Sequence, residues 1–293
     1  MTKPTERDLN DRRFYKAEQE AKFSDALPHE TPQTRHPAYK LAFQDTDFLL
    51  RDELRPVRFQ LELLKPEMLL DEAGVGSTFV MYGSARIPPP EAAEAALEGA
   101  KELPDEERRV VENLVKKSKY YQEALNLAKL VSEKSIVEGG KRQFVVTSGG
   151  GPSIMEAANR GASEAGAESI GLNIVLPHEQ APNSYVTPYL SLNFHYFALR
   201  KMHFLLRAKA VAVFPGGFGT FDEFFELLTL IQTGKMKPMP ILLFGKDFWN
   251  RVVDFEALAD EGTINRADLE LFRWCETADE AWAHVANFYD LKR

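Results

Sequence analysis

The sequence has almost no cysteine and no long apolar run, and these absences exclude several classes of protein. A single cysteine, Cys275, rules out an internal disulfide and a metal site built from cysteines. No stretch approaches the ~18 apolar residues of a membrane span, and the start "MTKPTERDLNDRRFYK" lacks the apolar core of a signal peptide. The histidines show no metal-ligand spacing. We therefore expect no metal, no membrane association and a cytoplasmic location.

An excess of positive charge is also missing. The chain carries 36 Lys and Arg against 44 Asp and Glu, for a net charge of -8. This balance argues against a protein that binds nucleic acid through bulk charge, but it permits a local basic pocket for one small anion. With 293 residues, of which 44% are hydrophobic, the chain can bury a core of one large domain or of one domain plus an appendage.

The two ends of the chain differ in composition. Residues 1 to about 40 are polar and rich in proline, which predicts an extended, mobile arm. From Phe43 to about Leu70 the apolar spacing is helical, and Pro66 is expected to interrupt the helix. We predict an arm with a helical extension over 1–76 and a second, larger domain over 77–293. The apolar stripe of the extension packs on the core or on another subunit, and it consists of Leu54, Val57, Leu61 and Leu64.

Short apolar runs alternate with helical patterns along the rest of the chain. Such runs suit buried parallel strands, and their alternation with helices predicts an α/β fold with a right-handed, doubly wound parallel sheet and helices on both faces. The expected strands are 77–82, 144–147, 169–176, 210–214, 239–245 and 271–276. The expected helices include 105–137, 193–209, 218–234, 247–262 and a last one ending near Tyr289.

Three of the expected strands end in small residues. The stretches are "YGSAR" (Tyr82 to Arg86), "TSGGGPS" (Thr147 to Ser153) and "PGGFGT" (Pro215 to Thr220). Tight strand–helix turns use glycine for conformational reasons alone. In an open α/β sheet, however, ligands bind beyond the carboxyl ends of the strands, so three such ends favour a binding crevice.

The "PGGFGT" stretch is typical of a site for one phosphate. It leads directly into a helix whose first N–H groups and dipole favour an anion. Gly216, Gly217 and Gly219 let the backbone approach a phosphate, and the Thr220 hydroxyl adds a donor. A dinucleotide fingerprint fits poorly, because Ile154 occupies the sixth position of "GGGPSI", and no P-loop is present.

A carboxylate follows this turn and has two interpretations. Thr220 to Glu223 reads as a T-x-x-E capping box, and Ser153 to Glu156 offers the same pattern. In the second interpretation Glu223 acts beside a bound phosphate. A nearby cation would then be needed to offset the repulsion, and Arg200 and Lys201 on the preceding helix can supply one.

The glycine-rich stretches and the helix that carries Arg200 resemble those of a known family. "PGGFGTFDE" matches the P-G-G-x-G-T-x-x-E signature of the LOG (LONELY GUY) family of cytokinin riboside 5'-monophosphate phosphoribohydrolases, often mislabelled as lysine decarboxylases. "ALRKMHFLL" resembles the family's Arg-Lys helix, and "YGSAR" and "SGGGPSIMEAANRGA" resemble its first two nucleotide-binding loops. The resemblance covers roughly Ser77 to Leu291.

This resemblance implies a Rossmann-like fold, hydrolysis of the N-glycosidic bond of nucleoside 5'-monophosphates, no cofactor, and a homodimer or larger homo-oligomer. Arg200 and Glu223 correspond to the family's catalytic arginine and glutamate, and 216–220 to its phosphate cradle. The further binding residues that it implies are Gly83, Ser84, Gly150, Gly151, Met155 and Lys201.

Several features depart from the compact members of the family. The chain has about 76 residues before its first strand, an insertion around 91–121, and Lys209 where an aspartate is common. AMP, or several purine and pyrimidine monophosphates, is therefore a better expectation than cytokinin nucleotides alone. Two alternatives remain open: a non-catalytic nucleotide binder or carrier of the same fold, and a pyridoxal-phosphate-dependent lysine decarboxylase.

Overall fold

The computed structural model describes residues 14–26, 30–177 and 181–291, which belong to two compact units, Met1–Leu61 and Glu62–Arg293. The first unit contains α1 (Ala17–Asp25), η1 (Pro37–Tyr39), α2 (Thr46–Leu49) and η2 (Asp52–Leu54). The arm is therefore not extended throughout, since it includes a helix at α1. Its residues 1–13 and 27–29 lie outside the described residues. The predicted domain boundary at residue 76 stays a prediction.

Helix α3 (Arg55–Glu72) crosses the division between the units and contains Pro66. The prediction that this proline interrupts the helix is wrong. A proline lacks the N–H that would bond the carbonyl four residues earlier, which here belongs to Glu62. The ring nitrogen Nε2 of His203 lies 3.0 Å from that carbonyl oxygen and replaces the missing partner. On the same helix, Val57, Leu61 and Leu64 are exposed.

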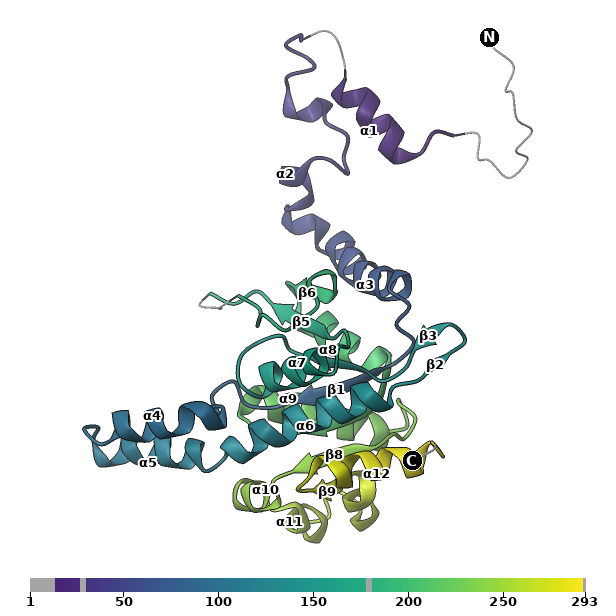
Figure 1. The fold of residues 1–293 in the computed structure, drawn as a ribbon. Coiled ribbons are helices and arrows are strands. Elements are labelled where there is room, and N and C mark those ends of the chain that lie inside the picture. Colours follow the sequence, from purple (N-terminus) through teal and green to yellow (C-terminus); the bar gives the residue numbers. More distant parts are fainter. Residues whose placement is uncertain (1–13, 27–29, 178–180, 292–293) are drawn as a thin grey trace. The chain divides into compact units, whose positions relative to one another are not determined.

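Seven parallel strands form the central sheet of the second unit, in the order β6-β5-β4-β1-β7-β8-β9 (Figure 1). The predicted doubly wound sheet is confirmed. The sequence did not reveal β6, which pairs with β5 where a helix was expected to begin, nor the small antiparallel hairpin of β2 (Val137–Glu138) and β3 (Lys141–Arg142). The strands of the sheet are β1 (Thr78–Tyr82), β4 (Val145–Ser148), β5 (Ile170–Ile174), β6 (Ser191–Phe194), β7 (Ala208–Val213), β8 (Ile241–Phe244) and β9 (Arg273–Cys275).

Two of the predicted helices are divided in the structure. The stretch 105–137 contains α5 and α6, and 247–262 contains α10 and α11. The second break follows from a cap, because the Asp254 carboxylate accepts a hydrogen bond from the Ala257 amide (2.9 Å) and begins a new helix. The helices are α4 (Pro90–Ala100), α5 (Asp105–Val115), α6 (Ser118–Lys134), α7 (Ile154–Glu164), α8 (Phe197–Leu206), α9 (Phe218–Gln232), α10 (Lys246–Val252), α11 (Phe255–Asp260) and α12 (Ala278–Phe288), with 3-10 turns η3 (Pro188–Leu190) and η4 (Arg266–Leu271).

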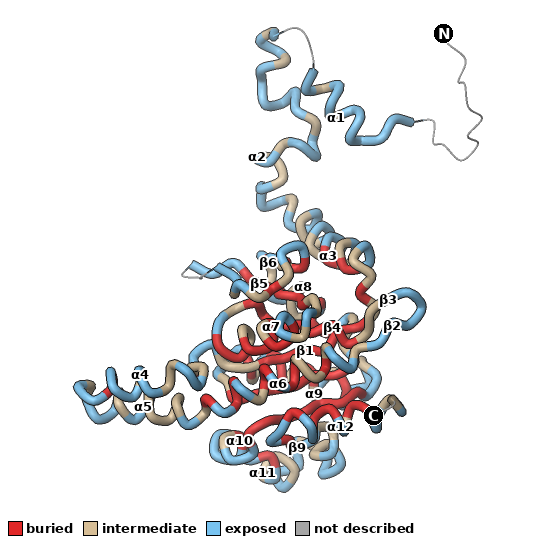
Figure 2. Tube along the Cα trace, viewed as in Figure 1, coloured by how far each residue is buried: buried red, intermediate tan, exposed pale blue. Residues whose placement is uncertain are grey.

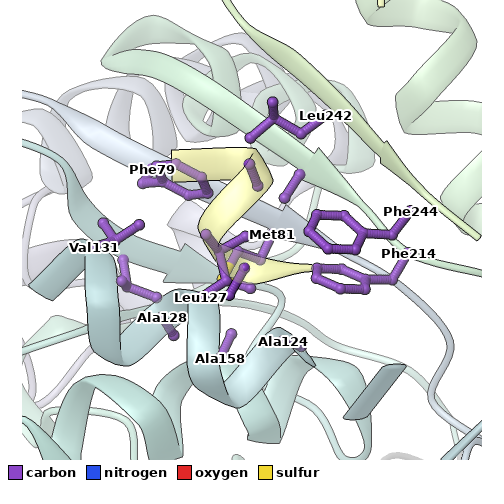
Figure 3. Close-up of a cluster of buried hydrophobic side chains, with 14 of the residues drawn as sticks. Phe79, Met81, Ala124, Leu127, Ala128, Val131, Ala158, Phe214, Leu242 and Phe244 are labelled. Carbon is purple, nitrogen blue, oxygen red and sulfur yellow. The ribbon is translucent and has the colours of Figure 1, made fainter. Parts of the chain in front are cut away.

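The side chains of β1 alternate between the two faces of the sheet, as the period of a strand requires. Phe79 and Met81 join a buried cluster with residues of α6 and α7 (Figure 3). Residues of α12 belong to the same cluster, and these helices cover one face of the sheet. Tyr82 belongs to the residues on the opposite face of β1, and its ring packs edge-on against Phe204 of α8, with ring centroids 5.0 Å apart. Burial is concentrated in the strands and in the helix faces that cover them (Figure 2).

The order of the strands creates a switch point around β1. From β1 the chain adds β4, β5 and β6 on one side, and then returns to place β7, β8 and β9 on the other side. Because all pairs are parallel, the loops after β4, β1 and β7 stand next to one another at the carboxyl edge. Those are the three glycine-bearing loops, and the switch point is where such sheets bind ligands.

Candidate functional site

A single pocket of about 1020 Å³ lies at this switch point and is lined by residues of all three loops. Arg200 and Glu223, the two predicted catalytic residues, both line it. Lys201 and Gly216 do not appear among its lining residues. The other predicted residues that line it are Gly83, Ser84, Gly150, Gly151, Met155, Gly217, Gly219 and Thr220.

The first turn of α9 offers open backbone to the pocket. The helix begins at Phe218, after Gly217, and no side chain caps it. A Cβ at Gly217 or Gly219 would meet nothing within 4 Å, so neither position is covered by the protein. Gly216 has a different role, because a Cβ there would lie 2.1 Å from Oγ1 of Thr220. The free N–H groups of this turn can therefore hold an anion.

Neither predicted capping box exists. Thr220 is the third residue of α9 rather than its cap, which places Glu223 one turn inside the helix. At α7, Ser153 is the cap residue by position, but its φ is +64° and its hydroxyl donates to the Ile87 carbonyl (2.6 Å). Glu156 accepts a hydrogen bond from the Tyr121 hydroxyl instead (3.0 Å).

Glu223 is a buried carboxyl group that lacks a full set of partners. Its residue is 7% exposed, and its Oε2 finds no hydrogen-bond partner among the described residues. Burial raises the pKa of Glu223 to about 7, an effect that the positive charges of Lys201 and Arg200 reduce and the negative charges of Glu226 and Asp222 increase. A carboxyl group with this pKa can exchange a proton at neutral pH.

Arg200 is held at the pocket by contacts along its side chain. Its Nε donates to the Leu172 carbonyl (2.7 Å), and the guanidinium lies over the ring of Phe204, 5.2 Å from the centroid. A Cβ at Gly149 would lie 2.8 Å from an Arg200 Nη, so glycine at that position leaves room for the guanidinium. The loop after β4 thus accommodates the arginine that α8 supplies.

Lys201 does not line this pocket. Its ammonium group pairs with Asp222 (2.9 Å) and Glu226 (3.0 Å), and it lines a smaller pocket of about 470 Å³. Like Gly216, Lys201 therefore lacks the place at the large pocket that the other predicted residues have, and its binding role stays a prediction. Its charge still lowers the pKa of Glu223.

Asparagine side chains hold the loop after β4, and the main one, Asn183, is half-buried. The Asn183 amide donates to the carbonyls of Gly150 (3.1 Å) and Gly151 (3.0 Å), and also to the side chain of Asn159 (2.9 Å). Gly150 has a φ of +73°, and a Cβ there would lie 2.2 Å from Oδ1 of Asn173. Positive φ and close packing together require glycine at this position.

The sequence interpretation missed several residues of the pocket. Tyr82 and Arg86 lie within the "YGSAR" stretch, but only Gly83 and Ser84 were assigned from it. Tyr82 and Arg86 could have been found by their place at a strand end. The apolar walls carry no local signal, since they come from separate helices and loops that only the fold brings together; they include Leu176, Phe197, Phe204, Phe218, Phe221 and Val252.

Comparison with known proteins supports the family resemblance. Residues 155–285 match the family model described as "Possible lysine decarboxylase". This match, which includes "PGGFGTFDE" and the Arg-Lys pair, confirms the predicted resemblance to the LOG family. A search of curated proteins finds no match. No helix among the described residues is long and apolar enough to cross a membrane.

Solved structures also resemble the chain. The structure of TM1055, a structural genomics target, is 22% identical, with 72% of this chain and 99% of that one covered and a TM-score of 0.43. The molybdenum cofactor carrier protein from Chlamydomonas reinhardtii is 17% identical. The comparison covers 73% of this chain and 99% of that one, with a TM-score of 0.41.

Proposed function

We propose that the protein hydrolyses the N-glycosidic bond of nucleoside 5'-monophosphates and releases the free base and ribose 5-phosphate. One observation carries this proposal: a buried carboxyl group with a pKa of about 7, that of Glu223, lines the same pocket as Arg200 and the open first turn of α9. The pocket thus combines an anion site with a group that can accept a proton. The resemblance to the LOG family supports the same reaction.

The substrate's phosphate would bind at the first turn of α9. Backbone N–H groups and the helix dipole favour an anion there, and the Thr220 hydroxyl can add a hydrogen bond. The uncovered positions Gly217 and Gly219 leave space for the phosphate against the backbone. One turn further along the same helix, Glu223 would then face the ribose.

In the reaction, the bond between C1' and the base nitrogen breaks and its electron pair leaves with the base. The ribose becomes cation-like, and the Glu223 carboxylate stabilises this charge, as carboxylates do in glycosidases. A water oxygen bonds to C1' and gives one proton to Glu223. The departing base takes up one proton from solvent, and Glu223 then releases its proton to solvent, which restores the carboxylate. The products together contain the atoms of the substrate and one water.

Arg200 would offset the negative charge that gathers in the pocket. Its guanidinium already lowers the pKa of Glu223, which keeps part of the carboxyl ionised. A bound phosphate would act in the opposite direction, because it adds negative charge near Glu223. The Glu223 carboxylate can therefore function beside the phosphate only if a fixed cation, here Arg200, offsets the negative charge of both.

The lysine decarboxylase description fits this pocket poorly. Pyridoxal phosphate binds its enzymes through a Schiff base to a lysine. No lysine is present among the described residues that line the large pocket, and Lys201, which does not line it, pairs with Asp222 and Glu226. We therefore derive no step through that cofactor.

A substrate panel tests the proposal. Purified protein is incubated with AMP, other purine and pyrimidine monophosphates and a cytokinin riboside monophosphate, and the free base and ribose 5-phosphate are measured by chromatography. We expect release of adenine from AMP, and no release from adenosine, which lacks the phosphate. Binding of the panel without release of any base would instead favour the non-catalytic carrier.

We also propose a homodimer or larger homo-oligomer, which light scattering would test.

A further inference from the structure

The large pocket contains a second buried polar group that the proposed reaction has not used. Tyr82, the last residue of β1, is 5% exposed and lines the pocket. Its hydroxyl finds no hydrogen-bond partner among the described residues. Buried tyrosine hydroxyls are normally paired, so an unpaired one at a pocket points to a partner that the ligand or a water supplies.

Unpartnered buried side-chain atoms occur elsewhere in the chain, but the large pocket collects two that complement each other. Tyr82 contributes a hydroxyl, which can donate, and Glu223 contributes a carboxyl oxygen, which accepts when ionised. The other described residues with such atoms do not line this pocket, and they are Thr78, Ser118, His203 and Trp282, together with Glu226, whose Oε2 pairs with Lys201 (3.0 Å).

The electrostatics fix the direction of the hydrogen bond from Tyr82. Burial raises the pKa of Tyr82 well above its ordinary value, and the negative charge of Glu223 raises it further. The phenol therefore stays protonated and keeps its donor. The ring cannot easily turn away from the pocket, because it packs edge-on against Phe204 at 5.0 Å.

One chemical group satisfies both residues at once. A phosphate dianion can accept from Tyr82 but has no proton to donate to Glu223, whereas a hydroxyl group both accepts and donates. We propose that Tyr82 and Glu223 together bind one hydroxyl group of the ligand complex, with Tyr82 donating to its oxygen and Glu223 accepting its proton. This inference rests on the proposed nucleotide site, and the hydroxyl belongs either to the ribose or to the attacking water.

The substitution Tyr82→Phe tests the inference, because it removes the donor and keeps the ring. Affinity for ribose 5-phosphate, which cannot be hydrolysed, is measured by calorimetry beside its 2-deoxy and 3-deoxy counterparts. If the hydroxyl is a sugar hydroxyl, Tyr82→Phe weakens ribose 5-phosphate binding about tenfold and leaves the matching deoxy compound unaffected. If it is the attacking water, whose oxygen becomes the C1 hydroxyl of ribose 5-phosphate, Tyr82→Phe weakens the binding of ribose 5-phosphate and of both deoxy compounds alike, and kcat for AMP falls about tenfold.

Thermal unfolding of the unliganded protein separates this role from a structural one. Tyr121→Phe is the matched control, since Tyr121 is 1% exposed, lies outside the pocket lining and has its hydroxyl bonded to Glu156. Tyr121→Phe should lower Tm without affecting affinity. Tyr82→Phe should leave Tm unchanged or higher, because no hydrogen bond within the protein is lost.

Two results would overturn the inference: a Tm that falls in Tyr82→Phe as it does in Tyr121→Phe, or an unchanged affinity for ribose 5-phosphate together with an unchanged kcat for AMP. The proposed function can fail separately. A wild-type protein that hydrolyses no nucleotide, but binds ribose 5-phosphate through the Tyr82 hydroxyl, would refute the hydrolase and leave the inference standing.

Discussion

The letters Thr-x-Asp-Glu occur near the start of two helices, at Thr220–Glu223 of α9 and at Thr277–Glu280 before and within α12. At α12 they form a capping box. The Thr277 hydroxyl accepts from the Glu280 amide (3.3 Å), and the Glu280 carboxylate accepts from the Thr277 amide (3.3 Å). At α9 the helix has already begun at Phe218, so the same letters lie within its first turns.

This difference in register separates two kinds of glutamate. Glu280 is exposed, and its carboxylate also accepts from the amide of Glu276 (2.9 Å). Glu223 is buried, and its Oε2 lacks a partner. Burial disfavours the ionised form of the Glu223 carboxyl and raises its pKa to about 7. The position of the Thr-x-Asp-Glu pattern relative to the first residue of the helix therefore decides whether its glutamate caps the helix or is buried.

Exchange of each glutamate for glutamine is expected to give the largest contrast. Glu223→Gln removes the proton acceptor and should lower kcat for AMP by about 10²–10⁴-fold. Glu280→Gln should leave kcat within about twofold, because glutamine also serves in a capping box. Steady-state rates of both variants, with circular dichroism to verify folding, make the comparison. Equal rates for wild type and Glu223→Gln would remove Glu223 from the reaction.

The raised pKa of Glu223 should also appear in the pH dependence of the rate. Activity requires the ionised carboxylate, so kcat/KM should fall about tenfold per pH unit below the pKa of about 7. The Glu280→Gln variant should keep the same profile, because its substitution lies outside the pocket. A profile that is flat between about pH 6 and 8 would contradict the assignment of Glu223 as the base.

The free energy of unfolding should depend on the protonation of the Glu223 carboxyl. Between the ordinary pKa of 4.5 and the folded value of about 7, Glu223 keeps a proton that the unfolded chain has lost. Its contribution to stability is therefore complete below pH 4.5 and is lost as the pH rises through 7. Urea unfolding should show Glu223→Gln gaining roughly 3 kcal/mol relative to wild type between pH 4.5 and 8. A constant difference across this range would contradict the raised pKa.

The contrast also shows which features the sequence could reveal. Apolar runs such as β1 and β8 are buried on both faces and were identifiable, and the three glycine loops directly follow β1, β4 and β7. β6 (Ser191–Phe194) alternates polar and apolar residues instead of forming an apolar run, and its strand character depends on pairing with β5. Helical periodicity alone could not reveal that Pro66 is accommodated, because the compensating partner, His203, is distant in sequence.

At the site, the residue types were predictable and their environments were not. The sequence identified Glu223 and Arg200 by motif and resemblance, but the register of α9 and the burial of the carboxyl group required the folded chain. Tyr82 was overlooked because it ends an apolar strand, where a tyrosine is usually a packing residue. Its unpartnered hydroxyl becomes visible only in the pocket.

Substitution at the open first turn of α9 should affect binding less strongly than Glu223→Gln affects turnover. The Cβ introduced by Gly219→Ala meets no protein atom within 4 Å, so the methyl group enters the space proposed for the phosphate. Affinity for ribose 5-phosphate should fall about tenfold while helix stability rises by about 0.5–1 kcal/mol. The matched control is Gly99→Ala in α4, whose Cβ is equally unobstructed. Gly99→Ala should reproduce the gain in stability without the loss of affinity. An unchanged affinity in Gly219→Ala would show that the phosphate does not bind at this turn.

The smallest effect is expected at the helix that the pattern does cap. Thr277→Ala removes the hydroxyl that accepts from Glu280 and should lower the free energy of unfolding by about 1 kcal/mol, measured by urea titration. Thr277→Ser keeps an acceptor and should restore most of this loss. Activity should stay at the wild-type level in both variants, since α12 contributes no lining residue to the large pocket. If Thr277→Ala were as stable as wild type, the capping box would contribute nothing, and the two patterns would differ only in the burial of their glutamates.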